Sequence, residues 1–369
     1  MRRLKKRRRN KQKKLLIIGS LSLLLFLCVG YAAFSTNLTI TAKGNIKEKT
    51  RVIQAWSETS QTDFHSDFYK QNIVSVTFLD NNKVPSNATE SWNVSEDKEN
   101  GGVMAWVIPN NDDNTKYDLY IGAKGGVIAN EDSSWLFYNF RGMSNLNFNN
   151  NFDTSNAVNM RNMFCYCTNL TTIDLSTFDT HNVTDMHDMF QMFVNDTSTV
   201  LENKLTNIIF GENWSTENVT TLSQMFVGCN QLTSLDVSNW DTSNVTNMMS
   251  VFAFCSSLTE IDVSGWNTSK VTNMGFLFTD CTKLSSIDLS NFDTSKVTDM
   301  QHMFRNCDTL TTLNLCSFNT SQVTNMTLMF AYADNLKEIK VGPNWTTVNA
   351  NTTYMFLQAG TSSVTTGQC

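Results

Sequence analysis

The sequence predicts an α/β solenoid, a curved stack of about seven strand–turn–helix units of 26 residues each. Three observations predict it: a fixed period, apolar residues at helical spacing, and a short strand motif in every period. A period in the twenties is typical of solenoids, because one such unit cannot bury its apolar face without stacked neighbours. An aromatic residue marks the start of the units, at Phe152, Phe178, Trp214, Trp240, Trp266, Phe292, Phe318 and Trp345.

The unit that starts at Phe292 shows how each element is predicted. Its apolar residues at offsets 5, 8, 12 and 15 share one face of an amphipathic helix: Val297, Met300, Phe304 and Cys307. The motif Asp-Thr-Ser at 293–295 precedes that face and offers side-chain oxygens to the first helical turn. Leu310, Leu313 and Leu315 then spell Leu-x-x-Leu-x-Leu, with the last two on one side of a strand. This is the leucine-rich-repeat pattern.

Curvature is expected from the two kinds of packing in each unit. Neighbouring strands lie ~4.8 Å apart, whereas packed helices need ~8–10 Å between their axes. The helical side of the stack is then wider than the strand side. The solenoid is therefore predicted to curve, with its strands on the concave face.

Six segments are expected along the chain. They are a basic segment at 1–14, an apolar segment at 15–34, a mostly β region at 35–126, a capping unit at 127–151, the solenoid at 152–360 and a frayed tail at 361–369. Strands are predicted in the β region at 73–78, 103–107 and 117–121, because these runs are rich in β-branched and aromatic residues between Asn and Gly pairs. The insertion at 194–204 is predicted to be a surface loop.

The first two segments predict export and membrane attachment. Residues 1–14 contain ten Lys and Arg and no acid, and residues 15–34 then form an uncharged run. Twenty residues span ~30 Å as a helix, which is enough to cross a bilayer. Positive charge before the run places the N-terminus in the cytoplasm and the rest outside. We expect a retained transmembrane anchor; the alternative is a signal peptide cleaved near Ala32 and secretion of the remainder.

The charge of the external part limits its partners. The whole chain has a formal charge of −6, and without the ten basic residues at 1–14 it has 18 Lys and Arg against 34 acids, a charge of −16. Such a field repels nucleic acid and favours cationic partners or divalent ions. The chain has no Gly-rich phosphate loop, nucleophile elbow or paired catalytic carboxylates. We therefore expect no enzyme and no cofactor, and the oligomeric state stays open.

Five cysteines share one offset in their units: Cys167, Cys229, Cys255, Cys281 and Cys307. A disulfide or metal ladder is one interpretation, and a row of small buried hydrophobic residues is the other. Because Phe193 and Ala333 occupy the same offset elsewhere, and adjacent helices would be too far apart for disulfides, we expect buried free thiols. Cys316 and Cys369 lie outside this register, and either is a candidate reactive thiol.

Two rows of acidic residues recur with the period. The first stands in the turn after each strand, where Asn substitutes for Asp and turn capping is expected: Asp153, Asp179, Asp241 and Asp293, with Asn267 and Asn319. The second is predicted to face outward on the concave sheet beside a row of serines: Asp174, Asp236, Asp262, Asp288 and Asn314, with Ser176, Ser238, Ser264 and Ser290. A solvated face, a ligand groove and a site for divalent ions are the three interpretations of this second row.

The repeat is similar to that of the BspA-type leucine-rich-repeat surface proteins of bacteria. The resemblance lies in Leu-Ser-Ser-Ile-Asp-Leu-Ser at 284–290 and Asn-Phe-Asp-Thr-Ser-Lys-Val-Thr-Asp-Met at 291–300. It extends to Glu-Ser-Trp-Asn-Val-Ser at 90–95, Val-Met-Ala-Trp at 103–106 and Ala-Asn-Glu-Asp-Ser-Ser-Trp-Leu-Phe at 129–137. The resemblance implies an exported, non-enzymatic cell-surface protein, because members of that family are associated with adhesion to host or matrix proteins. We expect a module that binds proteins or glycans, with the second acidic row on the concave face as its ligand site. A structural spacer is the alternative function.

Overall fold

The computed structural model describes residues 37–40, 46–194, 199–200, 202–367 and 369. The predicted basic segment at 1–14, the membrane segment at 15–34 and the cleavage position near Ala32 lie outside these residues. No helix among the described residues is long and apolar enough to span a bilayer.

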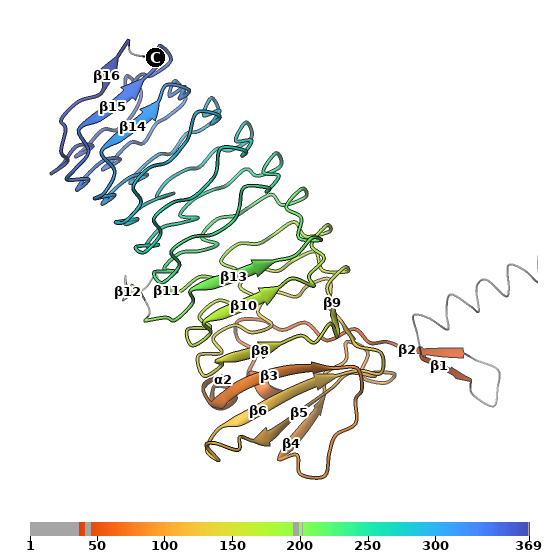
Figure 1. Cartoon of the computed structure of the whole chain (residues 1–369). Coiled ribbons are helices and arrows are strands. Elements are labelled where there is room, and N and C mark those ends of the chain that lie inside the picture. The colour runs from red at the N-terminus through yellow and green to blue at the C-terminus, as the bar shows by residue number, and fades with distance from the viewer. Residues whose placement is uncertain (1–36, 41–45, 195–198, 201, 368) are drawn as a thin grey trace, which may run out of the picture.

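The repeats form an elongated stack of rungs, with a larger sheet at its N-terminal end (Figure 1). Near that end the rungs carry β8 (Asn145–Asn147), β10 (Thr172–Leu175) and β13 (Asn207–Phe210). Near the other end they carry β14 (Thr312–Leu315) and β15 (Glu338–Val341). β10 pairs in parallel with β13, and β14 with β15, each over four residue pairs. Ile173 and Leu175 are buried while Thr172 and Asp174 are exposed, so the predicted alternation along the strands is confirmed.

The predicted helices are absent from the described repeats, and this part of the fold-class prediction is wrong. In their place every second main-chain N–H donates to the next unit: Met300 N to Asn325 O at 2.9 Å, His302 N to Thr327 O at 2.9 Å and Phe304 N to Met329 O at 2.9 Å. We call this set of bonds, repeated from unit to unit, the turn-side ladder. Left-handed backbone at His302 (φ 57°) and Asn306 (φ 58°) turns alternate peptide groups toward the neighbour and prevents a helix.

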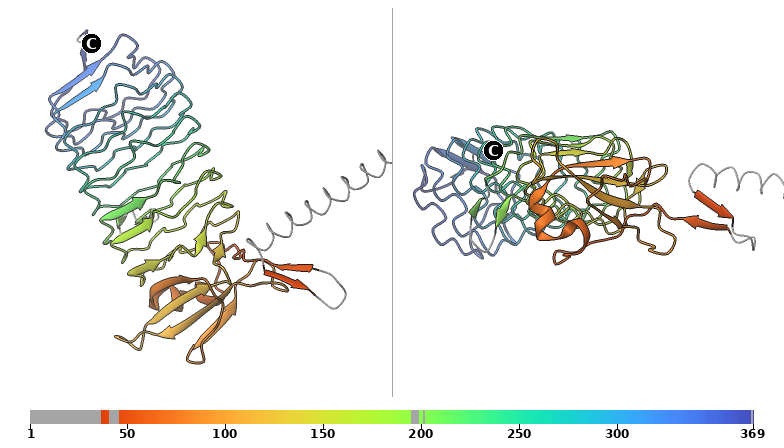
Figure 2. Two further views of the ribbon diagram at one scale, coloured as in Figure 1. Left: turned by 45° about the vertical axis from the view of Figure 1, so that its right-hand side comes forward. Right: turned by 90° about the horizontal axis from the view of Figure 1, so that it is seen from below.

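The turn-side ladder also removes the reason for the predicted curvature. Hydrogen-bonded rungs are as closely spaced on the turn side as on the strand side. The rings of Phe278 and Phe304 are 5.9 Å apart, as are those of Phe304 and Phe330, and both pairs are stacked. The predicted widening to the spacing of packed helices is therefore wrong. The rungs follow one another along a long axis in the left-hand view of Figure 2.

The N-terminal region is a five-stranded sheet with the order β4-β5-β6-β3-β8. The three predicted strands are present as β3 (Ile73–Leu79), β5 (Met104–Pro109) and β6 (Tyr117–Gly122). The sequence did not predict β4 (Glu90–Asn93) or the short helix α2 (Asp67–Asn72). Because β8 belongs to the capping unit and pairs in parallel with β3, the sheet continues from this region into the solenoid.

Three short pairs of strands complete the described chain. β1 (Asn37–Ile40) and β2 (Ile46–Lys49) form an antiparallel hairpin. β7 (Val127–Ile128) pairs in parallel with β9 (Phe152–Asp153), where the first full unit begins. The insertion forms a small antiparallel pair, β11 (Phe193–Val194) and β12 (Thr199–Val200), in place of a plain loop.

The C-terminal segment differs from the predicted frayed tail. β16 (Thr365–Thr366) pairs in parallel with β15 and adds a further strand to the stack. A disulfide joins Cys316 to Cys369, so the prediction of a reactive thiol at either position is wrong. The chain order of these residues gave no sign of the bond, because it depends on how the tail folds back over β15.

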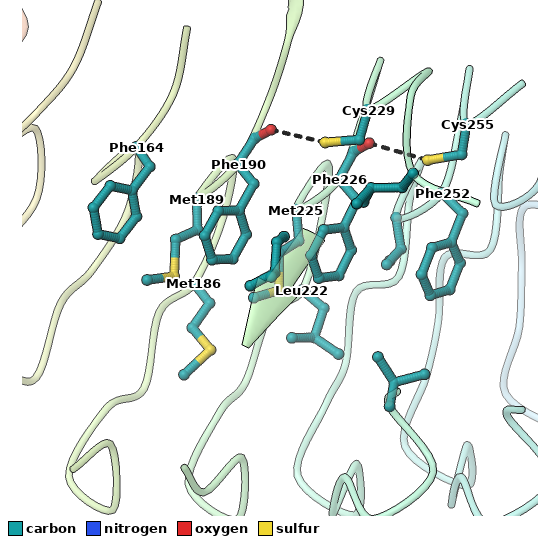
Figure 3. Close-up of a cluster of buried hydrophobic side chains, with 14 of the residues drawn as sticks. Phe164, Met186, Met189, Phe190, Leu222, Met225, Phe226, Cys229, Phe252 and Cys255 are labelled. Carbon is teal, nitrogen blue, oxygen red and sulfur yellow. Dashed lines mark hydrogen bonds between the residues drawn. The ribbon is translucent and has the colours of Figure 1, made fainter. Parts of the chain in front are cut away.

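A single apolar core runs the length of the solenoid, and the apolar face predicted at Val297, Met300, Phe304 and Cys307 lies in it. The register cysteines are buried and free, as predicted. They also make a polar contact that was not predicted (Figure 3): the Cys229 thiol donates to the Phe190 carbonyl at 3.1 Å, and the Cys255 thiol to the Phe226 carbonyl at 3.2 Å. Burial raises the pKa of the Cys229 thiol, so it stays protonated and able to donate.

Candidate ligand groove on the strand face

In the middle of the solenoid the hydrogen-bonded ladder of the strand face is interrupted. Between β13 and β14 the equivalent segments 233–237, 259–263 and 285–289 carry no regular strand. Among the described residues, the main-chain bonds that join them are Thr259 N to Thr233 O at 3.1 Å and Ser285 N to Thr259 O at 3.2 Å. By contrast, β10 and β13 form a full ladder. The three segments enclose a groove of 440 Å³.

The groove has an apolar floor and an acidic rim. Its lining comprises Leu235, Ile261 and Ile287 with Ser234, Ser286, Asp236, Glu260, Asp262 and Asp288. Ile261 is buried and Leu235 is half-buried, whereas the acids of the rim are exposed. The structure thus brings together Asp236, Asp262 and Asp288 from the predicted row, and places Glu260 beside them.

Each of these three aspartates is held by the serine two residues later. Asp262 Oδ1 accepts from Ser264 N at 3.0 Å and from Ser264 Oγ at 2.7 Å, and these bonds lower the pKa of Asp262. The same contacts join Asp236 to Ser238 at 3.2 and 2.7 Å. The carboxylates are therefore fixed in direction by these bonds. In the described contacts these bonds use Oδ1 and not Oδ2.

The pKa of Asp288 is also lowered, first by the main-chain N–H of Ser290, which donates to Asp288 Oδ1 at 2.9 Å, and then by its hydroxyl. The charge of Asp262 acts in the opposite direction and raises it. The predicted serines Ser238, Ser264 and Ser290 do not line the groove themselves. Their part in the site is to position the carboxylates.

The predicted row is not continuous, and two of its members lie elsewhere. In β13 the position equivalent to Asp174 is Ile209, which is 40 % exposed and separates Asp174 from the groove. Asp174 and Ser176 line a second, smaller hollow of 280 Å³ next to β8. At the other end Asn314 lies opposite Lys340 of β15, outside the groove.

The row of acids in the turns is structural. Asp153 Oδ1 accepts from Ser155 N at 3.0 Å, and Asp293 Oδ1 from Ser295 N at 2.9 Å. Asn267 and Asn319 accept the same bond, from Ser269 N and Ser321 N at 3.1 Å each. The turn-capping interpretation is confirmed, because the amide replaces the carboxylate without loss of the contact.

The sequence reasoning missed Glu260 and the apolar floor of the groove. Leu235, Ile261 and Ile287 repeat every 26 residues, so the period marks these positions in the sequence. They were predicted to lie only in the core. Within the described residues no group of three or more His, Cys, Asp or Glu is arranged to hold a metal ion. The lining of the groove combines carboxylates with apolar side chains.

Comparison with known proteins identifies the repeat. A family model described as "Mycoplasma protein of unknown function, DUF285" matches three overlapping segments, at 132–207, 191–287 and 259–366. The chain belongs to this family. The DUF285 matches cover most of the capping unit, the solenoid and β16, and the groove lies within the residues of the second and third matches. No curated protein and no solved structure matches the chain.

Proposed function

We propose that the chain is a binding module displayed outside a bacterial cell, with the groove at Asp236, Asp262 and Asp288 as its ligand site. The observation that carries the proposal is the opening of the strand ladder in the middle of the solenoid, where a floor and a charged rim replace a closed sheet. A regular repeat has no intrinsic need for such a break, since the ladders at β10–β13 and β14–β15 close fully.

The lining favours a cationic ligand. Four carboxylates surround apolar side chains, so a Lys or Arg side chain can lay its aliphatic stem on Leu235 or Ile287 and direct its charge to the rim. The formal charge of −16 on the external part adds long-range attraction for such partners. A basic segment of a host or matrix protein, or a glycan that carries amino groups, has this chemistry.

Attachment and location belong to the same proposal. The basic segment at 1–14 and the apolar run at 15–34 support a membrane anchor with the remainder outside, and cleavage near Ala32 with secretion is the alternative. The resemblance to BspA-type surface proteins supports adhesion as the role. The module acts by binding, without an enzymatic step or a cofactor.

The test is binding of residues 35–369 to a panel of host proteins and glycans, followed by a triple variant, Asp236→Asn, Asp262→Asn and Asp288→Asn. Asn314 accepts the turn bond from Cys316 N at 3.1 Å, so the amide preserves the local structure. We expect the variant to fold normally and to lose about tenfold or more in affinity for the captured ligand.

The matched control removes the same number of negative charges from the acids in the turns: Asp153→Asn, Asp241→Asn and Asp293→Asn. It removes three negative charges outside the groove, so it shows how much of any loss is due to net charge alone. Equal binding by the groove variant, the control variant and the unmodified protein would exclude the groove as the ligand site.

One observation favours a second candidate, a structural spacer that projects or shields the surface. Each groove aspartate already has a local partner in Ser238, Ser264 or Ser290, so its presence has a structural reason without a ligand. If the intact external part captures nothing from the panel, the spacer is the better account.

A further inference from the structure

The disulfide at the C-terminal end crosses over a strand. Cys316 directly follows β14, and Cys369 lies beyond β16, with β15 between them in the sheet order. Gly342 directly follows β15 and continues its register to Cys316, and a Cβ there would lie 2.2 Å from the Cys316 carbonyl oxygen. A side chain at Gly342 would therefore clash with the main chain that carries Cys316.

The bond holds a strand that has few other contacts. β16 is two residues long, and its register with β15 consists of Lys340 with Thr365 and Val341 with Thr366. Two paired residues give marginal stability to a strand. The Cα atoms of the two cysteines are 5.7 Å apart, and the bond closes a loop of 53 residues. The covalent link therefore supplies much of what keeps β16 against the end of the sheet.

Among the described cysteines, the two that form the disulfide are the ones that solvent can reach. Cys316 is half-buried and Cys369 is exposed, whereas the six free cysteines are buried. Their thiols lie in the core or against carbonyl oxygens, as Cys281 does against the Phe252 carbonyl at 3.1 Å. A thiol reagent in the medium thus reaches the Cys316–Cys369 pair and not the core register.

We propose that the Cys316–Cys369 disulfide is a redox latch: it holds β16 over the edge of β15, and its reduction by an external dithiol opens the C-terminal end of the solenoid. The released edge is the row of main-chain groups of Lys340 and Val341 that β16 covers. Reduction thus leaves the main-chain groups at this edge of the sheet unpaired.

The reaction is thiol–disulfide exchange. A thiolate of the dithiol attacks the exposed sulfur of Cys369, forms a mixed disulfide and displaces Cys316 as a thiolate, which takes a proton from water. The second thiol of the reductant then reacts as its thiolate. It attacks the sulfur by which the reductant is bound in the mixed disulfide, and it displaces the Cys369 thiolate, which takes a proton from water. Two electrons pass from the dithiol to the protein disulfide, and the reductant leaves as a disulfide.

The test uses the full chain with dithiothreitol as the dithiol, under conditions where the solenoid stays folded. Peptide-resolved labelling with iodoacetamide reports which cysteines react, and hydrogen exchange of the same samples reports the strands. We expect Cys316 and Cys369 to become labelled while Cys229, Cys255, Cys281 and Cys307 stay unlabelled. We expect amide exchange in Thr365–Thr366 and at the edge of β15 to rise about tenfold or more, with β10 and β13 unchanged.

The control is the double variant Cys316→Ser and Cys369→Ser. Serine already occupies the position equivalent to Cys316 in other units, as at Ser290, so the substitution suits the turn. The variant should show fast exchange at β16 without reductant and no response to dithiothreitol. Complete reduction of the unmodified protein with unchanged protection of β16 would overturn the latch, as would labelling of Cys316 in the oxidised protein.

Discussion

At the N-terminal end of the solenoid both sides of the first unit are covered, whereas at the C-terminal end only the strand side is. On the strand side β8 continues into the N-terminal sheet through β3, and β16 covers β15 at the other end. On the turn side the Leu136 carbonyl of the capping unit accepts from His65 Nε2 at 2.9 Å. In the last unit, among the described contacts, the main-chain N–H groups that would continue the turn-side ladder have no acceptor: those of Thr352, Tyr354, Phe356 and Gln358.

The difference follows from the direction of the turn-side ladder. In every rung the N–H groups point toward the next unit and the carbonyls toward the preceding one, as in Phe304 N to Met329 O and Phe330 N to Met355 O. The turn-side ladder therefore leaves carbonyl acceptors at the N-terminal end of the stack and N–H donors at the C-terminal end. Two C-terminal ends cannot pair through this ladder, because both offer donors only. The N-terminal end offers acceptors, and the N-terminal region meets them with a donor side chain.

The largest effect is expected from His65→Ala. His65 is buried, its Nε2 donates to the Leu136 carbonyl, and its Nδ1 lies 3.0 Å from Asp63 Oδ1. Removal of the ring leaves the Leu136 carbonyl without this donor and removes a buried ring that stacks on Trp56, which together cost about 3 kcal/mol in the free energy of unfolding. Urea unfolding measures it, with exposed His181→Ala as the control. A loss no larger than that of the control would mean that His65 does not close this end.

A smaller effect is expected inside the stack, where both sides of each unit are covered by neighbours. Cys281→Ala removes the thiol that donates to the Phe252 carbonyl and leaves a small cavity. The expected loss is about 1 kcal/mol, because the lost hydrogen bond is weak and Ala333 occupies the same register position in another unit. Urea unfolding of Cys281→Ala beside Cys281→Ser checks it. Unchanged stability of both variants would show that the sulfur contact contributes nothing.

Acid should weaken the interior units through their turn row. Hydroxyl and main-chain bonds from Ser295 lower the pKa of Asp293, and the main-chain N–H and hydroxyl of Ser243 lower that of Asp241. A carboxyl whose pKa is lower in the folded state contributes stability above its ordinary value of 3.8, and this is lost as the pH falls through the folded pKa. Thermal unfolding measured at a series of pH values from neutral to acid should show this loss of stability as a lower melting temperature. Asp293→Asn should make it shallower, and an identical pH profile would contradict the assignment.

The smallest effect is expected at the open C-terminal end. Tyr354 is 64 % exposed and belongs to the unit whose turn-side N–H groups have no acceptor. Its φ of 57° suits asparagine better than tyrosine. Tyr354→Asn should therefore change the free energy of unfolding by less than about 0.5 kcal/mol. The matched interior substitution Leu328→Asn, at the equivalent position, should cost more, and the reverse order would break the comparison between covered and open units.

The repeating fold could be predicted from the sequence because burial of the strands follows the period, as at Leu313 and Leu315. The backbone conformation of the turn side could not be predicted from the sequence. Met300, Phe304 and Cys307 have a spacing that suits a helix, but hydrogen bonds to the next unit replace those within the helix. The left-handed residue that makes this change, His302, is not a glycine, so no residue type marked it.

The candidate site was predicted in part for a similar reason. The outward positions of Asp236, Asp262 and Asp288 follow from the strand period, and the structure places all three on one groove. The outward position of Ile209 could be read from the strand residues around it, whereas the loss of the ladder around Asp262 depends on how neighbouring segments separate. The Cys316–Cys369 bond depends on how the tail folds back beside β15. Neither the loss of the ladder nor the disulfide follows from the spacing of residues in the sequence.

Site-resolved hydrogen exchange of the turn side tests the central claim most directly, namely that the units are joined there by a ladder that runs in one direction and ends open. The amides of Met300, His302, Phe304 and their equivalents in inner units should be strongly protected, whereas those of Tyr354 and Phe356 should exchange freely. Equal protection in the last unit, together with a helical far-ultraviolet circular dichroism spectrum, would contradict the account.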